Sequence, residues 1–244
     1  MQSFVTATIL LFRTQLARLV WSRRSLACLA LAAAPPFLAW IASRFNTRIP
    51  GGSIAVHIGW LLLIQVITPL CALVCGSAVV TEEIENRTIT YLFSRPIPRA
   101  AVLLGRWLAA LVVVSVSLGS SAVLTAALAS FSKAPGPLVD AGVIWPMLAA
   151  ALLGGAVYSG LFAAAGVFFR HPMIVGLGYA FAIEGFFANL PGKNQALTVQ
   201  YYLRSVIAAT GSGSWHDIEG FSSSRFDTLE GSMATLAVLL LGIL

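Results

Sequence analysis

The 27 residues from Ile54 to Val80 read IAVHIGWLLLIQVITPLCALVCGSAVV and contain no Asp, Glu, Lys or Arg. The hydrocarbon core of a bilayer is about 30 Å thick, and a helix of about 20 predominantly apolar residues crosses it. This stretch is therefore long enough to span a membrane as one helix. It predicts a membrane protein rather than a water-soluble domain.

The composition of the whole chain supports the same conclusion. Of its 244 residues, 58% are hydrophobic and 10% are charged, and the mean hydropathy is +0.88. Soluble domains are roughly 45–50% apolar and about 25% charged, so this chain has too few charges to cover a water-soluble globule. Ordinary soluble enzymes are excluded. The net charge of +6 is interpreted as a signal of membrane topology and not of nucleic-acid binding.

Six apolar runs predict an all-α membrane protein with six transmembrane helices. Besides 54–80, spans are expected at 25–43, 101–131, 143–169, 173–190 and from Ser232 onward. Pro35-Pro36 should kink or break the first span, because proline lacks a backbone N–H. The last run, Ser232 to Leu244, has 13 residues and is too short to cross a bilayer. We therefore expect the sixth helix to be incomplete here and the native chain to continue.

An amphipathic helix is predicted before the first span, over residues 2–22. Its apolar face comprises Val5, Ile9, Phe12, Leu16 and Leu19. The polar side chains Arg13, Gln15 and Arg18 lie away from that face. A basic amphipathic helix lies in the plane of the membrane interface, so residues 1–24 are expected to form an interfacial helix. A cytoplasmic helix packed on a partner protein is the alternative, and a signal peptide is disfavoured because 22 residues precede its basic region.

Basic residues are divided unequally between the two sides of the predicted bundle. Nine share the side of the N-terminus: Arg13, Arg18, Arg23, Arg24, Arg87, Arg95, Arg99, Arg106 and Arg170. Six lie on the other side: Arg44, Arg48, Lys133, Lys193, Arg204 and Arg225. Lys and Arg are enriched in cytoplasmic loops, so we expect a multi-pass protein of the inner (cytoplasmic) membrane with a cytoplasmic N-terminus.

The cytoplasmic loop, residues 81–100, is the stretch that most resembles a soluble helix. Thr81 is a plausible helix N-cap, and Glu82, Glu83 and Glu85 place negative charge in the first turn, where it is favourable. The predicted helix covers residues 82–93. Its apolar stripe comprises Ile84, Thr88, Tyr91 and Leu92, and Ser94-Arg95-Pro96 ends it. Such a short surface helix between two spans is shaped to dock into another protein.

The same stretch resembles the cytoplasmic loop of ABC-2-type transporter permeases. The resemblance rests on Glu82-x-Glu-x-x-x-Thr88, on Leu92-Phe-Ser-Arg95-Pro96-Ile-x-Arg99, and on Gly105-Arg106 before the third span. The layout agrees as well: an amphipathic start, six spans, and this loop between spans two and three. Asn86-Arg87 departs from the family pattern, which usually has a glycine just before the threonine.

The resemblance implies one transmembrane domain over residues 1–244 that is driven by a separate ATPase. No G-x-x-x-x-G-K-[ST] motif is present, so no catalytic residue, metal or cofactor is expected in this chain. ATP and Mg²⁺ are expected in the partner, with two ATPase subunits, a second permease copy or similar chain, and the lipid bilayer as partners. The residues expected to dock the ATPase are Glu82, Glu83, Ile84, Glu85, Arg87, Thr88, Tyr91, Leu92, Arg95 and Arg99.

The function that the resemblance implies is that of an exporter permease. Two other functions are alternatives to it. One is a membrane-anchored subunit that couples ATP hydrolysis to cell-envelope work or signalling without transport. The other is an intramembrane CAAX-type protease, because Glu82-Glu83-x-x-x-Arg87 resembles its first signature. The histidines His57, His171 and His216 lack the neighbours that those proteases require, which makes this function the weakest of the three.

Polar residues inside the apolar runs are candidate members of a transport pathway. These are Gln65, Ser117, Ser121 and Glu184. Glu184 is the only acidic residue within a span, and an ionised carboxylate there costs roughly 2.5–3.5 kcal/mol. It is expected either to face the pathway or to be neutral or paired with Gln65, His57 or Arg204; the small serines also suit helix packing.

The remaining features are expected to be structural. Cys28, Cys71 and Cys75 lie in apolar runs and are expected to pack there without forming a disulfide or a metal site. Residues 191–231 are expected to form an external loop. Its first half, with Tyr201 and Tyr202, suits an interfacial helix, and its second half is rich in Gly and Ser.

Overall fold

The computed structural model describes residues 2–45, 48–85, 99–169, 171–187, 195, 198–211, 213–216 and 228–243. Within these ranges the chain is helical, which confirms an all-α protein. The elements are α1 (Gln2–Val20), α2 (Arg23–Ala32), α3 (Ala34–Phe45), α4 (Gly51–Ile58), η1 (Gly59–Ile67), α5 (Thr68–Glu85), α7 (Arg99–Ala129), α8 (Ala141–Phe168), α9 (Pro172–Gly178), η2 (Tyr179–Phe187), α10 (Val199–Thr210), α11 (Gly213–His216) and α12 (Leu229–Ile243).

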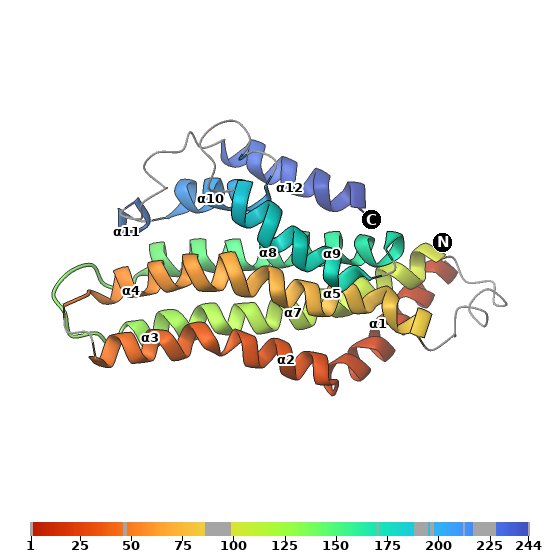
Figure 1. Cartoon of the computed structure of the whole chain (residues 1–244), viewed down its shortest axis with the longest axis horizontal. Helices are drawn as coiled ribbons and strands as arrows, with labels where there is room; N and C mark the ends of the chain where they lie inside the picture. The colour runs from red at the N-terminus through yellow and green to blue at the C-terminus, as the bar shows by residue number, and fades with distance from the viewer. Residues whose placement is uncertain are drawn as a thin grey trace.

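Four helical stretches are long and apolar enough to cross a membrane: Arg23–Phe45, Gly51–Ala78, Val102–Ala129 and Ala141–Phe168. They lie side by side along the long axis of the molecule (Figure 1). Two shorter apolar helices, Pro172–Phe186 and Leu229–Leu240, coincide with the fifth and sixth predicted runs. The positions of the apolar segments therefore follow the sequence prediction closely.

Prolines affect both of the first two spans, ending one helix in the first and changing the helix type in the second. Ala33 separates α2 from α3, and Pro35 and Pro36 occupy the first turn of α3, where a missing N–H does least harm. In the second span, Pro69 cannot donate to the carbonyl of Gln65. The chain before it is the π-helix η1, and both the backbone N–H and the hydroxyl of Thr68 donate to the carbonyl of Leu63, the hydroxyl over 2.8 Å.

The two ends of the bundle correspond to the two sides of the membrane predicted from the sequence. One end carries α1, the end of α5 and the start of α7, and the other carries α11 and the start of α4 (Figure 1). Among the described residues, Arg13, Arg18, Arg23, Arg24 and Arg106 belong to the first end. Arg44, Arg48 and Lys133 belong to the opposite end. The predicted grouping of these basic residues is thus reproduced by the fold.

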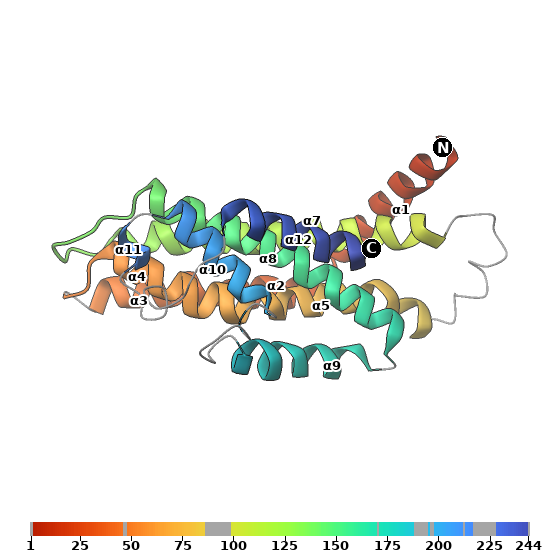
Figure 2. The same ribbon diagram turned by 90° about the horizontal axis from the view of Figure 1, so that it is seen from above.

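Helix α1 leaves the direction of the bundle and packs against the start of α7 (Figure 2). Gly105 makes this possible, because a Cβ there would lie 2.9 Å from the carbonyl oxygen of Thr8. The predicted apolar face is displaced: Gln15 is buried, whereas Ile9 is 53% exposed. The polar Gln15 lies in the contact because the position of Gly105, and not the apolar pattern alone, sets which face of α1 meets α7.

Two predicted boundaries differ from the structure. Helix α5 runs without interruption from Thr68 to Glu85, so Thr81 is not an N-cap, and Glu82 and Glu83 extend the second span. Residues Val199–Thr210, expected outside the membrane, form α10, which packs on the middle of α8: a Cβ on Gly154 would lie 2.9 Å from Cδ1 of Leu203. A helix was predicted in this segment. Its burial was not, because it depends on the contact between α10 and α8.

Small residues bring the long helices together, as expected. A Cβ on Gly76 of α5 would lie 2.7 Å from the carbonyl oxygen of Ser159 on α8. The hydroxyl of Ser159 accepts a hydrogen bond of 3.2 Å from Nε1 of Trp107 on α7. One short stretch of α8 therefore joins three spans.

The three cysteines are buried, unpaired by disulfides and in mutual contact. Sγ of Cys28 lies 3.3 Å from Sγ of Cys75 and 3.6 Å from the carbonyl oxygen of Cys71. The expected packing role is consistent with this geometry. Cys71 and Cys75 are four residues apart, so the sequence places them one helical turn from each other. It could not show that α2 brings Cys28 next to them.

We expect Gly76→Val to destabilise the chain strongly, because its side chain would meet the α8 backbone, and overpacking costs about 1–3 kcal/mol. Gly178→Val is the matched control, since nothing lies within 4 Å of a Cβ at Gly178. Thermal unfolding of the purified chain in detergent should show a lower Tm for Gly76→Val alone. Equal Tm values for both variants would contradict the proposed close contact.

Candidate functional site

Glu184 is fully buried on η2 and is surrounded by hydrogen-bond donors. Its Oε1 accepts from the hydroxyl of Tyr179 over 3.1 Å and from the backbone N–H of Val199 over 3.0 Å. Its Oε2 accepts from the backbone N–H of Gln200 over 3.2 Å. The carboxylate therefore lies at the N-terminus of α10.

This position explains how an acidic side chain is accommodated within an apolar bundle. The first N–H groups of a helix have no intrahelical partner, and the helix dipole favours negative charge there. Thr198 caps the same end, its hydroxyl oxygen accepting from the N–H of Tyr201 over 3.3 Å. Glu184 thus lets α10 begin beside other helices instead of in water. The partners of Glu184 expected from the sequence were all side chains, because a backbone N–H group leaves no pattern in the sequence.

Arg204 adds a second link between α10 and the second span. Its guanidinium carbon lies 5.0 Å from the ring centroid of Trp60, and both side chains are buried. This contact places Arg204 in a buried helix and not in the expected external loop.

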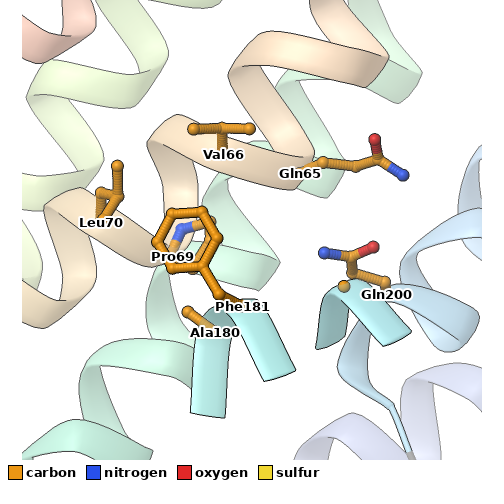
Figure 3. A pocket seen from close by; sticks show the side chains of 8 residues that line it. Gln65, Val66, Pro69, Leu70, Ala180, Phe181 and Gln200 are labelled. Carbon is orange, nitrogen blue, oxygen red and sulfur yellow. The ribbon is translucent and has the colours of Figure 1, made fainter. Parts of the chain in front are cut away.

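A pocket of about 140 Å³ lies next to this buried cluster (Figure 3). It is lined by Gln65, Val66, Pro69, Leu70, Ala180, Phe181, Gly185 and Gln200. The amides of Gln65 and Gln200 lie on the same side of it, one from η1 and one from the first turn of α10. The other walls are apolar.

Both π-helices contribute to the pocket. Gln65 and Val66 belong to η1, and Ala180, Phe181 and Gly185 belong to η2. Stretches of π-helix are rare and occur frequently at functional sites. The hydrogen bonds of Glu184 join η2 to the start of α10, and Pro69 follows η1 directly.

The pocket offers neutral hydrogen-bonding groups among apolar walls. A carboxamide donates and accepts hydrogen bonds without charge, and a space of this size holds a group comparable to a benzene ring. In the part of the chain that the structure describes, no group of three or more His, Cys, Asp or Glu side chains could hold a metal ion.

Of the four candidate pathway residues, the structure brings together two. Gln65 lines the pocket, and Glu184 lies behind it in the α10 contact. Ser117 and Ser121 are buried on α7 and do not line this pocket. The hydroxyl of Ser117 donates to the carbonyl of Val113 over 2.8 Å, as expected for a serine in helix packing. Gln200 also lines the pocket, although it was not among the candidate pathway residues.

The candidate docking residues are only partly visible. Glu82, Glu83, Ile84 and Glu85 form the last turn of α5, and Arg99 begins α7 at the same end. Arg87, Thr88, Tyr91, Leu92 and Arg95 lie outside the described residues. His57 on α4 and His216 on α11 are at the opposite end of the bundle from the end of α5 (Figure 1), whereas His171 directly precedes α9, at the same end as the last turn of α5.

We expect Glu184→Gln to lower the free energy of unfolding by about 1–3 kcal/mol, because the amide NH₂ would face a backbone N–H and leave a buried donor unsatisfied. Tyr179→Phe removes one donor and leaves the other two contacts, so its effect should be about 1 kcal/mol. Thermal unfolding in detergent checks both. A Glu184→Gln variant as stable as the wild type would show that the carboxylate does not hold α10.

Comparison with known proteins agrees with this arrangement of spans. A family model described as ABC-2 family transporter protein matches residues 4–205, which include α1, the pocket and the start of α10. No curated protein matches the sequence. Because the family match covers most of the chain, this protein belongs to the ABC-2 transporter family and is the membrane permease subunit of an ABC transporter.

Proposed function

We propose that the chain is the permease of an ABC exporter in the cytoplasmic membrane, with its N-terminus in the cytoplasm. The observation that carries this proposal is the family match over residues 4–205. The grouping of Arg13, Arg18, Arg23 and Arg24 at one end of the bundle supports the orientation.

Two separate ATPase subunits supply the energy. They dock on residues 82–93, the first four of which form the acidic last turn of α5, and on the start of α7. Those two helix ends lie at the same end of the bundle as α1 (Figure 1), so one partner surface can contact all of them. A second permease copy or a similar chain completes the complex, and ATP and Mg²⁺ bind in the ATPases.

The pocket between η1, η2 and α10 lies on the transport pathway in this proposal. Gln65 and Gln200 provide neutral hydrogen-bonding groups, and Phe181 and Pro69 provide apolar surface. Glu184 supports the pocket from behind by holding α10 and does not contact the substrate. Its three donors leave the carboxylate engaged within the protein.

We expect Leu92→Asp to abolish binding of the ATPase, because it places a charge in the apolar stripe of the docking segment. Leu138→Asp is the matched control, since Leu138 is 80% exposed between α7 and α8, at the opposite end of the bundle. Co-purification from membranes should recover the ATPase with the Leu138 variant and not with the Leu92 variant. Stoichiometric recovery with both would place the docking surface elsewhere.

We expect Gly185→Phe to block transport by filling the pocket. Gly185 lines it, and nothing lies within 4 Å of a Cβ built there. Gly178→Phe, in the same short apolar helix, also enters open space but lies outside the pocket. Complementation of a deletion strain should succeed with Gly178→Phe and fail with Gly185→Phe, while both bind the ATPase. Full complementation by Gly185→Phe would remove the pocket from the pathway.

A further inference from the structure

The turn between α1 and α2 is a tightly fixed corner. Only Trp21 and Ser22 separate the two helices. The hydroxyl of Ser22 donates to the carbonyl of Leu19 over 2.7 Å and accepts from the N–H of Ser25 over 3.3 Å. The hydroxyl of Ser25 donates in turn to the carbonyl of Val20 over 2.8 Å. These bonds fix the direction in which Trp21 points.

The outer surface of this corner is aromatic and cationic. Trp21 is 91% exposed, and Arg13, Arg18 and Arg23 are exposed as well. Trp21 follows Arg18 by three residues and precedes Arg23 by two, so all three belong to the same short turn of the chain. A tryptophan exposed to this degree is unusual unless a membrane interface or a partner covers it.

The surface becomes apolar directly below the corner. On α2, Leu26 is 63% exposed and Leu29 is 48% exposed. Both belong to the membrane-spanning stretch Arg23–Phe45. A water-soluble partner cannot follow the surface into this region, whereas an amphiphile with a polar head and an apolar tail can contact both parts.

The charge of this region has no acidic counterpart in the sequence around it. Residues 1–43 contain four arginines and no Asp or Glu, and the acidic residues Glu82, Glu83 and Glu85 belong to a different helix, α5. Arginine binds phosphate through two parallel hydrogen bonds, and each basic residue near an anionic membrane surface strengthens binding. The complementary ligand is therefore an anion that resides in the bilayer.

We propose that the α1–α2 corner is a binding site for an anionic phospholipid. Arg13, Arg18 and Arg23 bind the phosphate-containing headgroup, Trp21 lies at the level of the headgroup and glycerol, and Leu26 and Leu29 contact the acyl chain. The site would anchor α1 at the membrane surface and is independent of the substrate pathway.

Trp21 provides the readout for a test. The purified full-length chain in detergent is titrated with brominated phosphatidylglycerol or brominated phosphatidylcholine, and the same titration of Trp21→Phe isolates the quenching of Trp21. We expect half-maximal quenching by phosphatidylglycerol at a mole fraction roughly tenfold lower than that required for phosphatidylcholine. This preference should be lost at high salt.

Two matched double variants decide whether the site is specific. Arg13→Gln with Arg18→Gln should remove the preference while leaving quenching by phosphatidylcholine, which shows that the corner is still folded and in contact with lipid. Arg44→Gln with Lys133→Gln removes two exposed charges from the opposite end and should change nothing. Equal quenching by both lipids in the wild type, or equal losses in both double variants, would overturn the proposal.

Discussion

A backbone N–H group inside a membrane protein must find an acceptor within the protein, because lipid offers none. The beginning of α10 presents such groups beside the middle of the bundle, and the carboxylate of Glu184 accepts from two of them. The arrangement of the C-terminal half depends on this contact. It fixes η2 against α10, brings Arg204 over Trp60, and places the amide of Gln200 in the same pocket as that of Gln65.

Much of the fold could be predicted from the sequence, since hydrophobic length and proline act locally. The spans at 25–43, 54–80, 101–131 and 143–169 lie within a few residues of the observed helices, and the break before Pro35 was expected. The misplaced features depend on tertiary contacts. Gln15 is buried because α7 approaches at Gly105, and α10 is buried because Glu184 and Gly154 accommodate it.

The residues of the candidate site were identified only in part, because some of them come together only through tertiary contacts. Gln65 and Glu184 were identified because polar groups in apolar runs are conspicuous. Gln200 was not, because a glutamine is ordinary in a segment expected outside the membrane. Tyr179 and Trp60 were not, because aromatic residues are ordinary in an apolar span. The family, by contrast, was indicated by residues 82–106, and the family match confirms it. Sequence motifs thus identified the class of protein, and the three-dimensional arrangement revealed the pocket next to Gln65 and Gln200.

The close contact at Gly105 has a mechanical consequence. The carbonyl of Thr8 and the α7 backbone meet with no room for even a methyl group between them, so α1 and the first turns of α7 must behave as one rigid lever. A tilt of α7 at this end of the bundle would carry α1 with it, and the displacement would grow toward the N-terminus of α1 because α1 points away from the bundle.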